Sequence, residues 1–339
     1  MIDPNSFDGG LRFGPQTFVG QTGRNKVWAA PRELVCNQDR TECPTCGSCD
    51  RRVLFGKNPT YGCCSVCGMI YATTVPTDKD LLDYYRNGPA PKCWAEHVQQ
   101  HPLELMLDKL KFRWELELVG WPQILTSGLD DESDSLCDVG CSTGTLIETA
   151  LEMHAEIKQG KYPNIVGIDV NHGALELARS RTEELAKAEE CSLRFREASE
   201  PDPRYSRLIV LWEVLEHVID PNAMMKEVAF RVPQGPCTVL ICVPNAHSLA
   251  AKVLHEKAPM FGMGHFNIWG PSTLQMFLQR HLPDFTVEYR SIISWAKELT
   301  NHYRFKGPFD DDPEIVAMDP AVILKNLEGY KLVAIARRA

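Results

Sequence analysis

The sequence predicts an α/β protein in which a sheet of seven strands, most of them parallel, follows a small cysteine-rich ribbon and a helical segment. Three observations support this prediction. A short apolar strand runs into a turn of small residues and then into a helical pattern, over residues 135–158. From residue 131 onward, apolar runs alternate with helical patterns, as parallel sheets require. Two CxxC pairs precede this region.

The 339 residues divide into four expected parts. Residues 1–35 carry Gly, Pro, Asn and Asp at irregular spacing and are expected to form an arm. Residues 36–76 hold the cysteine ribbon, 77–130 a helical connecting segment, and 131–339 the sheet. Strands are expected at 135–139, 165–169, 192–196, 207–212, 237–243, 285–291 and 330–337, the last two as a hairpin. Helices are expected at 145–158, 172–189, 222–231 and 271–281.

Composition excludes several classes of protein. Hydrophobic residues make up 44% of the chain, enough for a packed core. With a net charge of −9, the chain as a whole lacks the excess of Lys and Arg that is typical of nucleic-acid-binding proteins. No apolar run approaches the length of a membrane span, and residues 1–5 lack the basic and apolar regions of a signal peptide. A cytoplasmic protein without a membrane partner is therefore expected.

The two CxxC pairs have the spacing of a four-cysteine zinc ribbon. Cys36, Cys49 and Cys63 create rival registers. We prefer the register in which a glycine, Gly47 or Gly68, follows the second cysteine of each pair, because such knuckles commonly need a positive φ there. Four thiolates leave no open position, so this zinc would be structural, and free buried cysteines are the alternative. The expected ligands are Cys43, Cys46, Cys64 and Cys67.

Three sequence features of the sheet region carry a resemblance to a known family. The glycine turn reads Asp-x-Gly-x-Ser-x-Gly over residues 138–144, unlike the G-x-G-x-x-G of dinucleotide-binding folds. A second apolar strand ends in Asp169, and residues 212–218 follow the fourth strand as Trp-Glu-Val-Leu-Glu-His-Val. In this order they resemble the motifs of class I S-adenosylmethionine-dependent methyltransferases, which have a seven-stranded, Rossmann-like sheet with an antiparallel last strand. An α/β domain whose glycine turn is merely tight is the alternative.

This resemblance implies a binding site for S-adenosylmethionine at the carboxyl ends of the strands. Asp169 would accept both ribose hydroxyls with its two carboxylate oxygens. Val170 would face the adenine, and Ser199, or Glu200 in its place, would stand where the family has an acid that reads the adenine amine. The remaining cofactor-binding candidates are Asp138 near the amino group, then Gly140, Cys141, Ser142, Thr143 and Gly144, and Trp212.

The motif after the fourth strand supplies the catalytic candidates Glu213 and His217, together with the later His265. Glu213, Glu216 and His217 would share one face if a helix starts at Glu213. With His265 they resemble the metal site of small-RNA 2′-O-methyltransferases and ubiquinone-pathway O-methyltransferases, which implies Mg²⁺ or Mn²⁺ at these four side chains. In other family members the Glu only orders the loop. A second interpretation makes His217 or His265 the general base.

The segment 246–270 is rich in Met, Phe, Trp and His and follows the fifth strand. Loops at the carboxyl ends of strands form the ligand crevice of open α/β sheets. Gly262 and Gly264 bracket Met263 and are candidate hinges. With Tyr85 and Trp94 from the helical region, this segment is expected to close over the acceptor, although plain core packing of these aromatics is equally compatible with the sequence.

Three functions from different classes follow. The first is methyl transfer from S-adenosylmethionine to oxygen or carbon of a small molecule, such as a sugar or a specialised metabolite, with a His general base. The second is an RNA methyltransferase with a zinc-finger recognition module, which the acidic balance disfavours. The third is a non-catalytic scaffold that binds the cofactor, which Glu213 and His217 beside an intact donor motif disfavour. The acceptor and the oligomeric state are left open.

Overall fold

A computed structural model of the chain describes residues 34–56, 58–121, 124, 133–157, 163–200, 204–258, 260–262, 264–292 and 320–339. Nearly all of the expected arm, residues 1–35, and Met263, which lies between the two candidate hinge glycines, lie outside these ranges. No helix within the described ranges combines the length and the apolar character that a membrane crossing needs.

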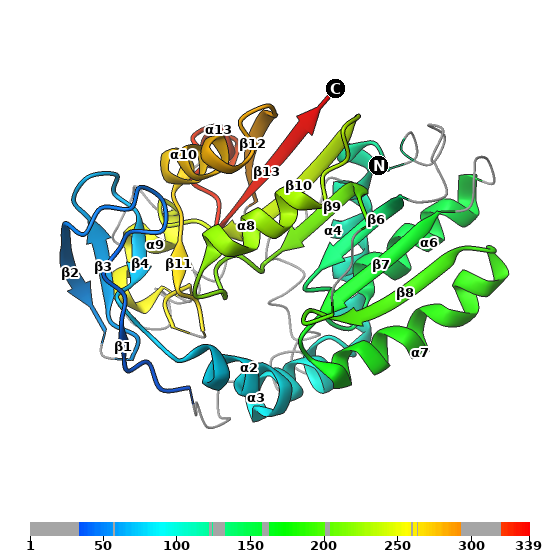
Figure 1. Ribbon diagram of the computed structural model, residues 1–339, viewed down its shortest axis with the longest axis horizontal. Coiled ribbons are helices and arrows are strands. Elements are labelled where there is room, and N and C mark those ends of the chain that lie inside the picture. Colours follow the sequence, from blue (N-terminus) through cyan, green and yellow to red (C-terminus); the bar gives the residue numbers. More distant parts are fainter. Residues whose placement is uncertain are drawn as a thin grey trace.

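Seven strands form the central sheet in the order β12-β13-β10-β9-β6-β7-β8 (Figure 1). Five neighbouring strands, from β10 to β8 in this order, pair in parallel. β13 lies between β10 and β12 and pairs antiparallel with both. Both the sheet and its antiparallel last strand are as predicted. The bounds are β6 Asp134–Val139, β7 Asn164–Asp169, β8 Ser192–Glu197, β9 Ser206–Trp212, β10 Cys237–Pro244, β12 Thr286–Ile292 and β13 Lys331–Arg338.

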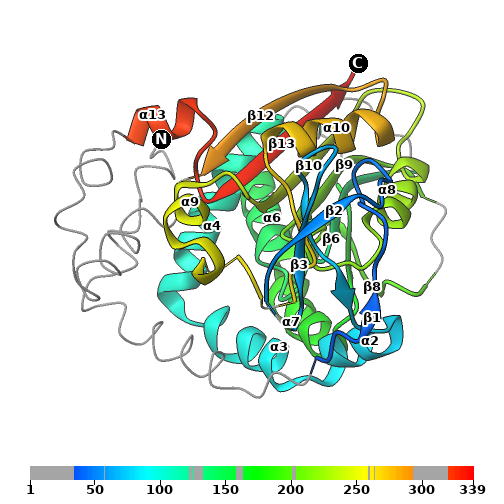
Figure 2. The ribbon, with the colours of Figure 1, turned by 90° about the vertical axis from the view of Figure 1, so that its left-hand side faces the viewer.

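Helices cover both faces of the sheet, so its central strands are apolar on both sides. All eight residues of β10 are buried. Val239 and Ile241 pack in the cluster that includes α8 (Pro221–Phe230) and α10 (Pro271–His281). Leu240 faces the opposite cluster, with α4 (Pro102–Val119), α6 (Thr145–Ile157) and α7 (His172–Ala188). In Figure 2, α8 and α10 lie on one side of the strands and α4 and α6 on the other.

The cysteine ribbon shares its sheet with a strand from the second half of the chain. β2 (Arg51–Phe55), β3 (Tyr61–Cys64) and β4 (Ile70–Ala72) form an antiparallel sheet. Its fourth strand is β11 (Asn267–Ile268), which pairs antiparallel with β4. The ribbon is also closed by β1 (Gln38–Asp39), which pairs with β5 (Thr74–Val75). Thus the loop after β10 reaches across and completes the ribbon sheet.

Short helices connect the ribbon to the sheet. Thr77 caps α2 (Asp78–Asn87) by accepting a hydrogen bond from the Asp80 N–H, and Gly88 ends the helix. α3 (Pro89–Cys93) continues into a π-helical turn at Trp94–Val98. α4 then packs on α6, and Gly120, at φ 81°, ends it. Within the described ranges, the remaining helices are α9 (Leu249–Leu254), the 3₁₀ turn His255–Lys257 and α13 (Pro320–Lys325).

Candidate functional site

The glycine turn after β6 is tightly packed at two of its residues. Gly140 and Gly144 have φ of 74° and 76°, in the region where a side chain is strained. A Cβ on Gly140 would lie 2.5 Å from Val214, and one on Gly144 would lie 2.9 Å from Ala178. Ser142 between them also has a positive φ, of 48°. The spacing of glycines therefore reflects both backbone conformation and close approach of neighbouring segments.

Two carboxyl groups lie at the ends of β6 and β7, beside this turn. Asp169 accepts hydrogen bonds from the backbone N–H groups of Ser142 and Asn171, both at 2.8 Å. Burial raises its pKa. Burial, and then the charge of Asp169, raise the pKa of Asp138 well above its ordinary value. Because two buried acids repel each other as anions, this edge of the sheet favours a ligand that carries positive charge.

The other cofactor-binding candidates have different surroundings. Cys141 and Thr143 are buried in the turn, and Val170 is half-buried after β7. Trp212 ends β9 and packs edge-on against Phe112, with ring centroids 5.5 Å apart. Ser199 is exposed in the turn after β8.

Residues of the connecting helices contact the glycine turn and the ends of β7 and β8, which the sequence did not indicate. The Ser142 hydroxyl donates to Gln99 Oε1 at 2.9 Å, immediately after the π-helical turn. Arg86 of α2 forms an ion pair with Glu197 at 2.7 Å. Asn171 Nδ2 donates to the Tyr85 carbonyl at 2.8 Å. These contacts join residues that are 43 to 111 positions apart, so no local pattern could reveal them.

A second group of side chains, Glu216, His217 and His265, converges beyond β9 and β10. One ligand atom of each lies within 4.8 Å of the others. No helix starts at Glu213, so the condition under which Glu213, Glu216 and His217 would share a helical face is not met: Glu213 has a left-handed φ of 57°, and residues 215–217 form a turn. Glu213 does not join the group, and its carboxylate forms an ion pair with Lys331 at 2.6 Å. Three of the four expected metal ligands therefore lie together.

The buried carboxylate of Glu216 has no hydrogen-bond partner at either oxygen among the described residues. The residue is fully buried. Burial, and then the charge of Glu213, raise its pKa well above the ordinary value. A buried carboxyl group without partners is costly, since its desolvation is not compensated. Such a group indicates a missing partner on the side where the imidazoles lie.

Both imidazoles are held through Nδ1. His265 Nδ1 lies 2.9 Å from the Met260 carbonyl oxygen. His217 Nδ1 lies 3.2 Å from the Gly264 carbonyl oxygen and 2.8 Å from the Tyr85 hydroxyl. A carbonyl only accepts, so the bond of His265 places its proton on Nδ1 and leaves the Nε2 lone pair available. For His217 the nearer partner is the Tyr85 hydroxyl, which can donate to Nδ1 or accept from it. Burial lowers the pKa of His217 to about 3 and also lowers that of His265. Both rings are therefore neutral at neutral pH.

The expected acceptor wall is only partly in place. The Tyr85 hydroxyl lies 2.8 Å from His217 Nδ1. Trp94 instead packs in a small apolar cluster with Ala90 and Val98. Met260, Phe266 and Trp269 are completely buried, so they are core and not the surface of a ligand crevice. The reason is β11, whose pairing with the ribbon turns this part of the loop inward.

The four predicted zinc ligands lie together in the ribbon. The Sγ atoms of Cys43 and Cys67 are 3.5 Å apart, as are those of Cys46 and Cys64, and all four lie within 4.8 Å of one another. Gly47 and Gly68 have φ of 78° and 80°, as the chosen register requires. The rival cysteines 36, 49 and 63 are not in the group. Four sulfurs at these separations suit tetrahedral coordination.

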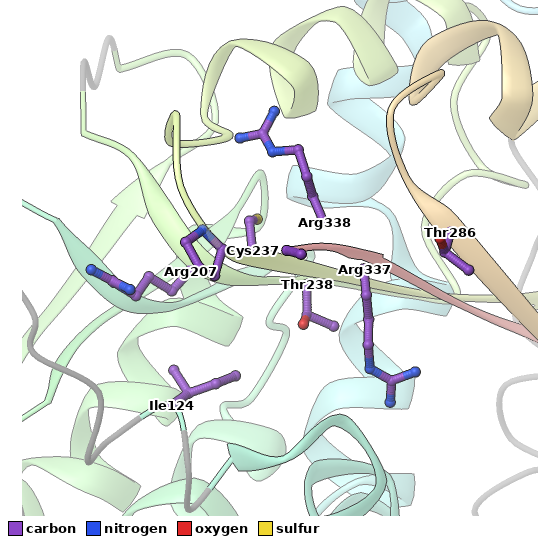
Figure 3. A pocket seen from close by; sticks show the side chains of 9 residues that line it. Ile124, Arg207, Cys237, Thr238, Thr286, Arg337 and Arg338 are labelled. Carbon is purple, nitrogen blue, oxygen red and sulfur yellow. The ribbon is translucent and has the colours of Figure 1, made fainter.

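A pocket of about 340 Å³ lies away from both groups, where β9 and β10 begin and β13 ends (Figure 3). Arg207, Arg337 and Arg338 are among its lining residues. It contains none of the predicted site residues, which lie at the carboxyl ends of the parallel strands.

A family model and two curated relatives each match part of the chain. Residues 115–282 match a family model described as a methyltransferase domain. Ubiquinone biosynthesis O-methyltransferase of Acinetobacter baylyi is 26% identical over 148 residues, which are 43% of this chain and 55% of the relative. The enzyme of the same name from Bordetella avium is 26% identical over 162 residues, 48% and 59% of the two chains. The match thus spans little more than half of these relatives.

Solved structures of methyltransferases resemble the chain at lower identity. Magnesium protoporphyrin IX methyltransferase from Synechocystis with bound SAH has a TM-score of 0.48 and 12% identity, over 77% of this chain and 99% of that one. The small RNA methyltransferase HEN1 has a TM-score of 0.46 and 16% identity, over 68% and 25%.

Proposed function

We propose that this chain, whose residues 115–282 match a methyltransferase domain, is a class I S-adenosylmethionine-dependent methyltransferase. It would methylate an oxygen of a small-molecule acceptor, with a divalent cation held at Glu216, His217 and His265. The unpartnered carboxylate of Glu216 beside two imidazoles carries this proposal. The printed names of the two curated relatives, both O-methyltransferases, support oxygen as the methylated atom. The net charge of −9 supports a small molecule over nucleic acid.

The residues present fit a cation. Glu216 would supply the negative charge, and the two Nε2 lone pairs would complete three ligands on one side of the ion. Two imidazoles with one carboxylate favour an ion such as Mn²⁺ over Mg²⁺, which prefers all-oxygen sites, since Glu213 is engaged by Lys331. When bound, such an ion acts as a Lewis acid that lowers the pKa of an acceptor hydroxyl. Tyr85 and the Gly264 carbonyl orient His217 for this role.

The residues that we propose to bind the methyl donor lie in the turn after β6 and beside it. Asp169 would hold the ribose hydroxyls of S-adenosylmethionine while it also fixes the backbone of Ser142 and Asn171. Asp138 and the turn 140–144 would hold the methionine part, where the two acids suit its ammonium and sulfonium charges. The catalytic effect of the protein would come mainly from holding donor and acceptor in line.

For the ribbon we propose a structural zinc ion on Cys43, Cys46, Cys64 and Cys67. Tight turns carry the two CxxC pairs: the Gly47 N–H donates to the Cys43 carbonyl, and the Gly68 N–H donates to the Cys64 carbonyl. The four thiolates would fill the coordination sphere, so this ion would take no part in methyl transfer.

The substitution Glu216→Gln tests the proposed cation site. The substitution keeps the shape of the side chain and removes its charge, so Mn²⁺ affinity is expected to fall at least about 100-fold, as loss of a charged buried ligand implies. Mn²⁺ binding is followed by electron paramagnetic resonance, and methyl transfer is assayed on a panel of small hydroxylated compounds. S-adenosylhomocysteine affinity should stay unchanged, because the donor site does not include Glu216.

The matched control is Glu227→Gln on the exposed side of α8, which should bind Mn²⁺ like the wild type. His217→Ala and His265→Ala should each lose Mn²⁺ as Glu216→Gln does. If the wild type methylates its acceptor without any divalent ion and Glu216→Gln remains active, the cation proposal is wrong and a histidine base takes its place.

A further inference from the structure

The ribbon reaches the acceptor side of the site through the hydroxyl of Tyr61. Tyr61 lies on β3 and is 2% exposed. Its hydroxyl donates to the His265 carbonyl at 2.8 Å and accepts from the Gly262 N–H at 2.7 Å. The ring packs against Phe261, with centroids 5.3 Å apart. One ribbon side chain therefore binds the backbone on both sides of Gly264, at Gly262 and at His265.

A second connection runs through Asn267 on β11. Its Nδ2 donates to the carbonyls of Leu215 at 2.9 Å and Val218 at 2.7 Å, which flank Glu216 and His217. Its Oδ1 accepts from Arg40 Nη1 at 2.8 Å, just before the first zinc knuckle. The side chain is completely buried, and both its amide oxygen and its amide nitrogen form hydrogen bonds. Asn267 thus ties the turn that carries Glu216 and His217 to the ribbon.

We propose that the ribbon positions the group Glu216, His217 and His265, with Tyr61 and Asn267 as the positioning residues. The role of that group as a cation site rests on the proposed function; its positioning by the ribbon does not. A ribbon of short strands buries too little surface to be rigid alone and depends on its metal. Zinc in the ribbon would therefore support the acceptor side of the catalytic domain, through β3, β4 and β11, without contacting a reactant.

The zinc knuckle itself is anchored on the same side of the sheet. Trp269 Nε1 donates to the Thr45 hydroxyl at 3.2 Å, and Asn222 Nδ2 donates to the Pro44 carbonyl at 3.1 Å. Cys43 and Cys64 belong to the apolar cluster that contains Leu215. The connection from the ribbon to the Glu216 turn is therefore continuous, by hydrogen bonds and by packing.

Tyr61→Phe tests the proposal because it removes two hydrogen bonds and keeps the ring. Two lost bonds of ordinary net strength correspond to roughly a tenfold effect. Amide hydrogen exchange in peptides covering 213–219 and 264–268 is expected to accelerate about tenfold, whereas the peptide covering 138–146 stays unchanged. Mn²⁺ affinity should fall by a similar factor, with zinc content and S-adenosylhomocysteine affinity as in the wild type. Asn267→Asp, which turns the donating amide into an acceptor facing two carbonyls, should show the larger effect in 213–219.

Tyr71→Phe is the matched control, since Tyr71 lies on the neighbouring strand β4 and its buried hydroxyl makes no hydrogen bond to the described residues of 213–219 or 264–268. The Tyr71→Phe protein should show the amide hydrogen exchange rates of the wild type. Should Tyr61→Phe and Asn267→Asp leave exchange at 213–219 and 264–268 at the rate of Tyr71→Phe, the ribbon does not position the group. A wild type that binds no Mn²⁺ would reject the cation site only, and the exchange rates would still decide the positioning.

Discussion

Asp169→Ala is expected to weaken the binding of S-adenosylhomocysteine by at least about 100-fold, because hydrogen bonds to a charged group contribute about 1.5–3 kcal/mol each. The carboxylate has two tasks at the end of β7. It would accept the ribose hydroxyls, and it holds the N–H groups of Ser142 and Asn171 at 2.8 Å. Alanine removes both, so the turn after β6 loses its side-chain link to β7 and keeps only the bonds from the Gly140 and Cys141 N–H groups to the Ile168 carbonyl. Isothermal titration calorimetry measures the change.

Glu176→Ala provides the matched control for this prediction. Glu176 lies on α7, close in sequence to Asp169, and its side chain is 58% exposed in an ion pair with Arg179. Exposed pairs contribute little, so affinity for S-adenosylhomocysteine should be unchanged. Near-normal affinity of a folded Asp169→Ala protein would refute the assignment of this carboxylate to the ribose.

Cys43→Ser and Cys67→Ser are each expected to yield insoluble protein, whereas the wild type carries about one zinc per chain. Structural zinc in small modules contributes roughly 10–16 kcal/mol of apparent binding free energy, as much as the whole stability of a typical domain. Cys43 also lies in the apolar cluster with Trp269 and Phe277, so loss of the knuckle would expose part of the main core. Metal analysis and the soluble fraction on expression are the measurements.

Cys49→Ser is the control, because Cys49 is exposed and lies outside the group of four sulfurs. It should remain soluble with one zinc per chain. Soluble, active protein without zinc would contradict the structural role that we propose for the metal.

Local patterns were sufficient for the sheet and for the glycine turn. Each parallel strand is a short apolar run, and each glycine of 138–144 is needed by its own φ or by a neighbour in contact. The register of the zinc ligands was predictable for the same reason, since Gly47 and Gly68 encode a backbone conformation. Asp169 was predictable because the end of a strand places an acid at the ligand edge.

Long-range packing decided the acceptor side. The left-handed φ of Glu213 separates it from Glu216 and His217, although their spacing is that of one helical face. The pairing of β11 with β4 buries Phe266 and Trp269, which the sequence suggested as a ligand wall.

The sequence by itself determined the class of fold, the donor motif and the cysteine register, because each depends on residues within a few positions of one another. Only the tertiary structure decided which acid joins the two imidazoles and that Tyr61 and Asn267 hold them. Those contacts join residues 49 to 227 positions apart. Their formation depends on how the ribbon and the sheet pack together, and neither segment encodes that separately.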